Sequence, residues 1–154
     1  VVLDDADFDI DEYVWEFGSE MIIERYISGP EVQVAVINDK AIGVIEIRPK
    51  KLFYDYECKY TKGMTDYVMP AEIDPDKYRE ARDLAYKCHK ELGCQSISRA
   101  DFKLSDQDGK FYFLELNTQP GFTPLSLVPQ IASHEGISFD QIVEFLINQA
   151  VNNV

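Results

Sequence analysis

The chain has 154 residues, of which 45% are hydrophobic, and its net charge is −13. A hydrophobic fraction of this size supports a packed core and excludes a disordered chain. The strong negative charge makes nucleic acid and anionic membranes poor partners, and no apolar run approaches the roughly 20 residues of a membrane-spanning helix.

The first residues of the chain show no targeting segment. Residues 1–5 have neither the basic start nor the apolar stretch of a signal peptide. Because the chain also lacks an initiator methionine, we expect it to begin inside a longer protein. Its cysteines, Cys58, Cys88 and Cys94, are odd in number and lack Cys-x-x-Cys spacing. We therefore expect reduced thiols in the cytoplasm, with no disulfide framework and no zinc site.

The N-terminal third is predicted to contain one helix and three strands. Residues 9–17 indicate a helix that stops at a glycine, and residues 21–27 indicate a strand. Residues 31–37 alternate well, turn at residues 38–40 and continue as a strand over residues 41–47. This pattern predicts an antiparallel hairpin.

Residues 48–69 are predicted to be mostly loop, dense in tyrosine and lysine. Within this segment, residues 53–60 hold four aromatic side chains and one lysine. Aromatic faces can stack on a purine, and a lysine ammonium can bind a phosphate. The alternative is a small aromatic cluster beside an exposed lysine.

Three helices are predicted in the C-terminal half. Asp74 and Pro75 begin a helix that runs to Leu92, where a glycine follows. Residues 125–134 and 139–150 form two closing helices, the second capped by a serine.

The long helix is expected to bury one stripe of side chains against the sheet. That stripe comprises Tyr78, Ala81, Ala85, Cys88 and Leu92. The two histidines, His89 and His134, are expected at the surface or at helix ends, and we do not expect them to bind metal.

The most informative pattern is a polar hairpin. Two apolar stretches, residues 98–104 and 111–116, are joined by a segment with an Asp-Gly pair, which predicts a tight turn. With Gly109 in the left-handed conformation, the expected register pairs Asp106 with Lys110, Asp101 with Glu115 and Arg99 with Asn117.

Side chains of a strand alternate between its two faces, so Arg99, Asp101, Glu115 and Asn117 are expected on one side of the sheet. Two opposed carboxylates repel each other, and a bound divalent cation is one solution. Asp, Glu and Asn oxygens are the hard ligands that Mg²⁺ or Mn²⁺ prefers. The alternative is a solvated polar face in which Arg99 neutralises the acids.

Five segments together carry a resemblance to a known family. They are residues 24–31, 53–60, 99–101, 115–121 and 125–129. They resemble the C-terminal part of the D-alanine–D-alanine ligases, members of the ATP-grasp superfamily. The resemblance implies an α+β ATP-grasp lobe, an antiparallel sheet with flanking helices, which we expect on one side of the sheet. It also implies that residues 1–154 are the C-terminal ATP-grasp domain of a ligase whose other domains lie upstream.

The resemblance also implies a role for each matching residue. The adenine of ATP would lie in a pocket lined by Glu24, Arg25, Tyr26 and Ile27, with Phe53 packed nearby. Glu31 would accept hydrogen bonds from the ribose hydroxyls, and Lys59 would contact the γ-phosphate. Asp101, Glu115 and Asn117 would hold two Mg²⁺ (or Mn²⁺) ions. Arg99 and the backbone of Gly121 would stabilise an oxyanion, while Tyr60, Ser126 and Leu127 would meet the amino-acid substrate.

The activity implied is ATP-dependent ligation of two D-alanines through an acyl phosphate, for peptidoglycan precursor synthesis. Tyr60 beside Lys59 favours the dipeptide over a D-lactate ester. We expect the complete ligase to form a homodimer, and residues 1–154 alone to be inactive because no Gly-rich phosphate loop is present. Two alternatives remain: another ATP-grasp carboxylate–amine ligase with a different amino-acid substrate, and a non-catalytic acidic interaction domain.

Overall fold

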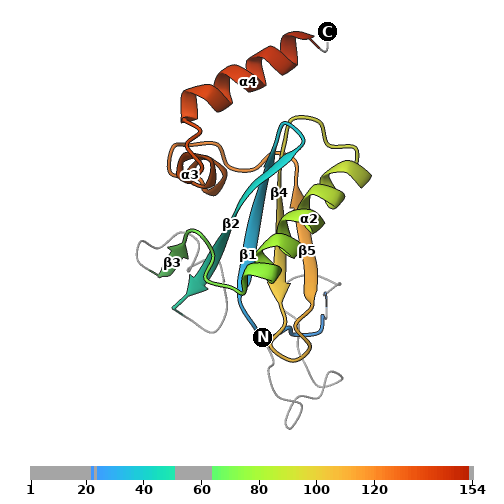
Figure 1. Cartoon of the computed structure of the whole chain (residues 1–154). Coiled ribbons are helices and arrows are strands. Elements are labelled where there is room, and N and C mark those ends of the chain that lie inside the picture. Colours follow the sequence, from blue (N-terminus) through green and yellow to red (C-terminus); the bar gives the residue numbers. More distant parts are fainter. Residues whose placement is uncertain (1–21, 23, 51–63, 153–154) are drawn as a thin grey trace.

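The computed structural model describes residues 22, 24–50 and 64–152. They form a five-stranded antiparallel sheet with strand order β3-β2-β1-β4-β5 (Figure 1). The strands are β1 (Glu31–Ile37), β2 (Lys40–Pro49), β3 (Thr65–Val68), β4 (Ile97–Leu104) and β5 (Phe111–Asn117), and the helices are α2 (Pro75–Glu91), α3 (Leu127–His134) and α4 (Phe139–Asn152). The expected α+β architecture is confirmed.

Helices cover both faces of the sheet, so the expectation of helices on one side is wrong. All seven residues of β1 are buried. The even-numbered valines of β1, such as Val32 and Val34, pack with Ala81 and Ala85 of α2. A strand at the centre of a sheet presents side chains on both faces, and each face needs its own cover.

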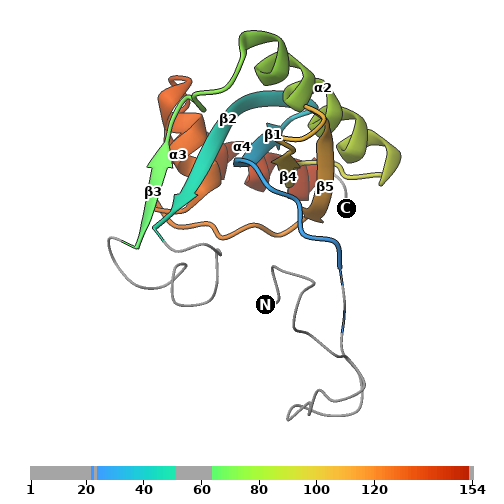
Figure 2. The same ribbon diagram turned by 90° about the horizontal axis from the view of Figure 1, so that it is seen from below.

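The opposite face is covered by the other two helices. Ala35 of β1 and Ile45 of β2 pack with Val128 and Ile131 of α3 and with Ile142 of α4. Figures 1 and 2 show α2 and the α3–α4 pair on different sides of the sheet. This second apolar cluster reaches only part of the face, because the remainder carries polar residues.

The two predicted hairpins are confirmed. β1 and β2 are joined at Asn38 and Asp39, whose φ angles are 52° and 56°. Adjacent residues with positive φ are typical of the tight hairpin turn whose twist matches the strands. The second hairpin pairs β4 with β5.

The register of the second hairpin is confirmed at the site and wrong at the turn. Asp101 faces Glu115 and Arg99 faces Asn117, as expected. A bulge between Asp101 and Phe102 leaves one extra residue on β5, so the strands nearer the turn pair one residue out of step with the prediction. Gly109 has the expected positive φ of 65°.

The ends of α2 are confirmed, but its buried stripe is partly wrong. The Asp74 carboxylate accepts a hydrogen bond from the backbone N–H of Asp76 at 2.8 Å, as an N-cap residue does. Ala81 and Ala85 are buried, whereas Leu92 is 64% exposed because it lies at the helix end. The remaining members of the expected stripe, Tyr78 and Cys88, are partly buried against the core.

His89 is fully buried, which corrects the expectation of a surface position. Its Nδ1 lies 2.7 Å from the Ser98 hydroxyl of β4, so the side chain joins α2 to the sheet. The other histidine, His134, is exposed in the last turn of α3, as expected.

Other boundaries differ from the predictions. The described residues among 21–27 are not in a strand. Residues 48–69 were expected to be loop, yet β2 extends into this segment and β3 lies at its end. Ser138 caps α4 as expected, with its hydroxyl accepting from the Gln141 N–H at 3.2 Å. The helix predicted at residues 9–17 lies outside the described residues.

Two further observations concern the described residues. Cys88 and Cys94 are free thiols, and Cys58 lies outside the described part. Of the helices described, none has the length and apolar character needed to cross a membrane.

Candidate functional site

The polar end of the β4–β5 hairpin brings three of the predicted site residues together. Arg99 Nε and Nη2 donate to the two carboxylate oxygens of Asp101, at 2.8 and 2.9 Å. The same Nη2 lies 3.4 Å from Glu115 Oε1. The predicted common face of these side chains is therefore confirmed. The arginine bridging both acids also fits the alternative of a neutralised polar face.

Asp101 is the buried member of this group. It is 4% exposed, and burial raises the pKa of its carboxyl to about 6, against the lowering effect of Arg99. The charges of Glu115 and Glu31 add to the increase in the pKa. Arg99 therefore does not fully offset the cost of burying this carboxylate charge, and a further cation here would stabilise the charged form.

The donor set at this end of the hairpin fits a hard divalent cation. Asn117 lies opposite Arg99, and its Oδ1 accepts a hydrogen bond from the Gln119 N–H at 3.0 Å. A carbonyl oxygen has two lone pairs, so one remains for a metal ion. Residues 22, 24–50 and 64–152 contain no group of three or more His, Cys, Asp and Glu side chains that could hold a metal. Any site here rests on two carboxylates and one amide oxygen.

The loop after β5 lies against the start of α3. Ser126 Oγ accepts from the Thr123 N–H at 2.9 Å, and a Cβ added to Gly121 would come within 3.3 Å of the same oxygen. The backbone of Gly121 therefore lies beside Ser126. Leu127 is partly buried and packs its side chain against the second apolar cluster. The N-terminus of a helix attracts a carboxylate.

The segment expected to bind adenine is fastened to the β4–β5 turn. Asp106 N–H donates to the Ser28 carbonyl at 3.0 Å, and the Ser28 hydroxyl donates to the Asp106 carboxylate at 3.1 Å. Arg25 Nη2 donates to Gln107 Oε1 at 3.2 Å. The Arg25 side chain therefore points to this turn.

Gly29 allows this close approach. Its φ is +131°, and a Cβ at this position would lie 1.9 Å from the Leu104 carbonyl oxygen. Only glycine fits a backbone that passes another backbone so closely. Glu31 follows directly, at the start of β1, and is buried with 9% exposure. Two of its neighbours, Gln33 and Lys103, were not singled out by the sequence analysis.

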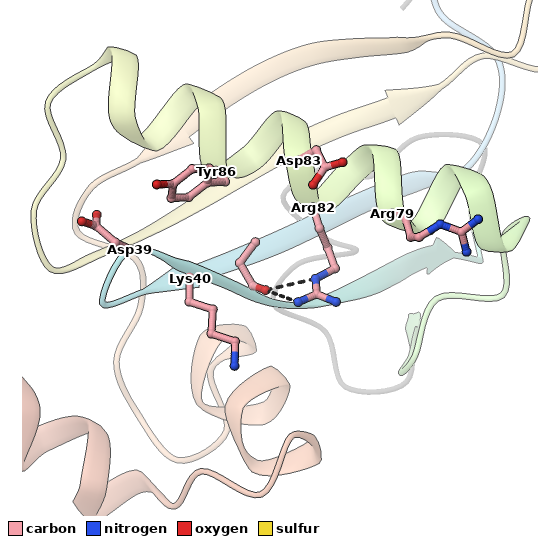
Figure 3. Close-up of a pocket in the computed structure, with 7 residues that line it drawn as sticks. Asp39, Lys40, Arg79, Arg82, Asp83 and Tyr86 are labelled. Carbon is pink, nitrogen blue, oxygen red and sulfur yellow. Dashed lines mark hydrogen bonds between the residues drawn. The ribbon is translucent and has the colours of Figure 1, made fainter.

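A hollow of about 400 Å³ lies between the β1–β2 turn and α2. It is lined by Asp39, Lys40, Ala41, Arg79, Arg82, Asp83 and Tyr86, none of which is a predicted site residue. Figure 3 shows the Arg82 guanidinium turned onto the Ala41 carbonyl, while the side chains of Lys40 and Arg79 point in different directions. Anion binding would require the cationic groups to converge on a common point, and these groups do not.

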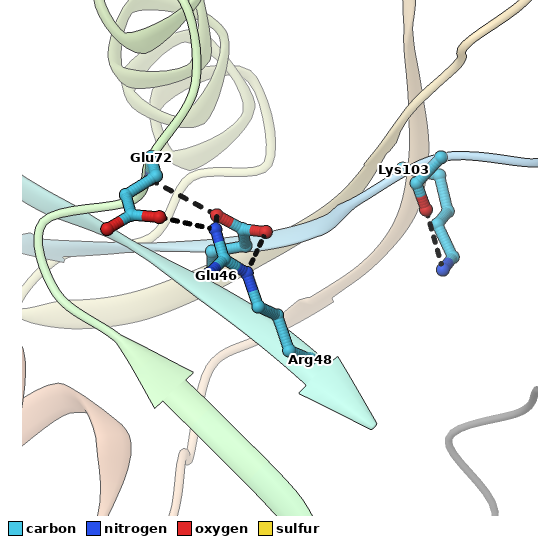
Figure 4. Close-up of polar contacts among 5 residues, drawn as sticks. Glu46, Arg48, Glu72 and Lys103 are labelled. Carbon is cyan, nitrogen blue, oxygen red and sulfur yellow. Dashed lines mark hydrogen bonds and ion pairs between the residues drawn. The ribbon is translucent and has the colours of Figure 1, made fainter. Parts of the chain in front are cut away.

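Phe53, Lys59 and Tyr60 lie outside the described residues. The base of the segment that carries them is described: Lys50 N–H donates to the Met64 carbonyl at 2.9 Å. Next to this base, Arg48 contacts both Glu46 and Glu72, at 2.6 and 2.9 Å (Figure 4). These contacts fix both ends of the segment on β2 and β3.

Comparison with known proteins decides the family. Residues 9–148 match the family described as the D-ala D-ala ligase C-terminus. The chain belongs to this family. It is 44% identical over 151 residues to the D-alanine–D-alanine ligase of Rickettsia typhi, which covers 97% of this chain and 47% of that ligase. The corresponding ligase of Sinorhizobium fredii is 44% identical over 138 residues, or 88% of this chain and 45% of the relative.

Solved ligase structures share the fold. The D-alanine–D-alanine ligase from Bacillus anthracis complexed with ATP superposes with a TM-score of 0.69 at 26% identity, covering 84% of this chain and 40% of that one. The VanG D-Ala:D-Ser ligase from Enterococcus faecalis gives a TM-score of 0.66 at 37% identity, covering 80% and 36%. The expected ATP-grasp fold is thereby confirmed. The chain spans about half the length of the curated relatives it matches.

Proposed function

We propose that this chain is the C-terminal ATP-grasp domain of a ligase that uses ATP to join two D-alanines for peptidoglycan precursor synthesis. The observation that carries the proposal is the Asp101–Glu115 pair on the polar face of the β4–β5 hairpin. The 44% identity to D-alanine–D-alanine ligases supports the choice of substrates. We place the reaction in the cytoplasm and expect the complete ligase to be a homodimer.

In the proposed reaction, one D-alanine carboxylate attacks the γ-phosphate of ATP, which releases ADP and gives an acyl phosphate. The amine of the second D-alanine then attacks the acyl carbon, and phosphate leaves. Residues 24–27 would offer backbone N–H and C=O groups to adenine, and Glu31 would accept hydrogen bonds from the ribose hydroxyls. Arg99 and the Gly121 N–H would stabilise the oxyanion that forms at the attacked carbonyl. The N-terminus of α3, at Ser126 and Leu127, would receive the carboxylate of the second D-alanine.

Asp101, Glu115 and Asn117 would hold two Mg²⁺ or Mn²⁺ ions. When bound, these ions offset the negative charge of the phosphates during phosphoryl transfer. In this proposal Phe53 would pack near adenine, Lys59 would contact the γ-phosphate and Tyr60 would meet the substrate. We propose that the segment of residues 51–63, fixed at both ends, excludes water from the acyl phosphate.

The decisive experiment is phosphate release by the complete ligase with ATP and D-alanine. Glu115→Ala is expected to lower kcat on the order of 10³-fold, because bridging cations are worth several kcal/mol in the transition state. Glu144→Ala, which removes an exposed carboxylate of α4, is the matched control and should leave kcat unchanged. Undiminished activity of the folded Glu115→Ala variant would contradict the assignment of these carboxylates.

A second candidate is a ligase that accepts a different second substrate. The 37% identity to a D-Ala:D-Ser ligase structure favours keeping it. A panel of D- and L-amino acids added to the complete ligase separates the two candidates. Preference for D-alanine at the second position supports the dipeptide ligase, whereas preference for D-serine replaces it.

The chain by itself tests the proposed division into domains. Residues 1–154 alone are expected to make no dipeptide, because the chain matches the C-terminal part of the family and spans only 47% of such a ligase. Measurable ATP-dependent dipeptide synthesis by the isolated chain would contradict that expectation.

A further inference from the structure

Two side chains contact the Glu31 carboxylate, each at a different oxygen. Gln33 Nε2 donates to Glu31 Oε1 at 3.5 Å, and Lys103 Nζ lies 3.8 Å from Glu31 Oε2. Gln33 is two residues further along β1, so it shares a face with Glu31, whereas Lys103 is the register partner of Glu31 on β4. The carboxylate therefore has one neighbour for each oxygen.

Lys103 also ties Glu31 to the segment that precedes it. Its Nζ donates to the Gly29 carbonyl at 3.3 Å, a contact that Figure 4 shows. The Lys103 side chain is only 22% exposed, so its ammonium is held in place by these two contacts. One cation thus connects the backbone proposed to bind adenine with the carboxylate proposed to bind ribose.

Gln33 provides the second observation, because one end of its amide is buried without a partner. The residue is 3% exposed, and Oε1 has no hydrogen-bond partner among the described residues. Turning the amide over would place Oε1 against a carboxylate oxygen of Glu31, and two acceptors repel each other. The amide therefore directs its N–H at Glu31 and leaves a buried acceptor unsatisfied, an arrangement that costs free energy unless a donor arrives. A ribose hydroxyl is such a donor.

We propose that Gln33 and Lys103 are positioning residues that orient Glu31 toward the ribose of the nucleotide, and that they set the preference of the ligase for nucleotides with ribose hydroxyls. The inference rests on the proposed function, because it takes ATP as the ligand of this face. Gln33 lies opposite Asp101 on β4, so it also places Glu31 at a fixed distance along the sheet from the proposed metal ligands.

The test compares ATP with 2′,3′-dideoxy-ATP in the complete ligase. For Gln33→Met and for Lys103→Met, we expect the KM for ATP to increase about 3- to 10-fold, the effect of one lost hydrogen bond, with kcat little changed. The KM for the dideoxy nucleotide should not change, because this nucleotide lacks the hydroxyls that would donate hydrogen bonds to Glu31. In a Glu31→Gln background Lys103→Met should have no further effect, because Lys103 acts on the nucleotide only through Glu31.

Lys110→Met is the matched control for the loss of a lysine charge, since Lys110 lies on the exposed turn with a side chain 76% exposed. It should leave both KM values unchanged. Because Gln33 is buried, Gln33→Met carries a risk to folding, and the more exposed Lys103→Met tests the proposal independently.

Equal increases in KM for ATP and for the dideoxy nucleotide would overturn the inference and leave the ligase activity in place. If the unsubstituted ligase shows no D-alanine-dependent activity, the proposed function fails instead. Titration calorimetry with the same two nucleotides then still decides whether Gln33 and Lys103 act on ribose recognition.

Discussion

The two faces of the sheet differ sharply although the same strands build both. The face toward α2 is mainly apolar, with Val32, Val34 and Phe102 in one cluster. The other face is apolar under α3 and α4, but polar at Glu31, Gln33 and their neighbours on β4 and β5. Alternation along each strand allows one face to supply stability while the other holds buried charge. The comparison implies that substitutions on the two faces change different properties.

The largest effect on stability is expected on the α2 face. Phe102 is 2% exposed, and its ring lies 5.9 and 5.8 Å from those of Phe111 and Phe113, edge to face. Phe102→Ala should lower the free energy of unfolding by about 3–5 kcal/mol, measured by denaturant titration. Glu115→Ala, on the other face of the same hairpin, should change it by less than about 0.5 kcal/mol. Similar losses for both variants would show that the faces are not separable.

A smaller effect on stability is expected at Gly29, where the segment before β1 passes close to the end of β4. Gly29→Ala should lower the free energy of unfolding by about 2–3 kcal/mol, because its Cβ would collide with the Leu104 carbonyl. Gly93→Ala is the control: Gly93 also has a positive φ, of +68°, but open space surrounds its Cβ position. It should cost about 1 kcal/mol. Thermal unfolding of both variants measures the difference. Equal losses of stability would show that the positive φ of Gly29, and not the contact with Leu104, causes the effect.

The smallest effect is a pH dependence from the apolar side. Burial lowers the pKa of His89 below its ordinary value of 6.5, against the raising effect of nearby Asp39, with Lys90 also lowering it. The unfolded chain therefore binds a proton that the folded chain does not. The free energy of unfolding should fall as the pH drops below 6.5.

His89→Gln should flatten that pH dependence in denaturant titrations between neutral and mildly acidic pH. The matched control is His134→Gln, because His134 is exposed at the end of α3. If the stability of His89→Gln falls with acid as steeply as that of the unsubstituted chain, another group causes the loss.

Alternation and turn chemistry predicted much of the sheet. The β1–β2 hairpin and the pairing of Asp101 with Glu115 follow from period-two patterns bounded by turn residues. The N-cap at Asp74 followed from the Asp-Pro pair. These features depend on residues close together in the sequence, so one sequence was enough to find them.

The features that the sequence did not reveal depend on how separate helices and strands pack together. His89 is buried with its Nδ1 2.7 Å from the Ser98 hydroxyl, and no local sequence pattern indicates that contact. The bulge on β5 becomes visible only in the pairing of β4 with β5. Lys103 meets Glu31 only when β4 pairs with β1, and alternation along β1 does not show that the Gln33 amide is buried beside Glu31.

The contacts of residues 24–30 with the β4–β5 turn have a consequence for the order of folding. Arg25 and Gln107 are 82 residues apart in sequence, and Ser28 and Asp106 are 78 apart. Because these partners are so far apart in the sequence, closing the loop between them costs conformational entropy before the contacts form. During synthesis residues 24–30 leave the ribosome well before the β4–β5 turn exists. We therefore expect nucleotide-binding competence to emerge late, after the β4–β5 hairpin has formed.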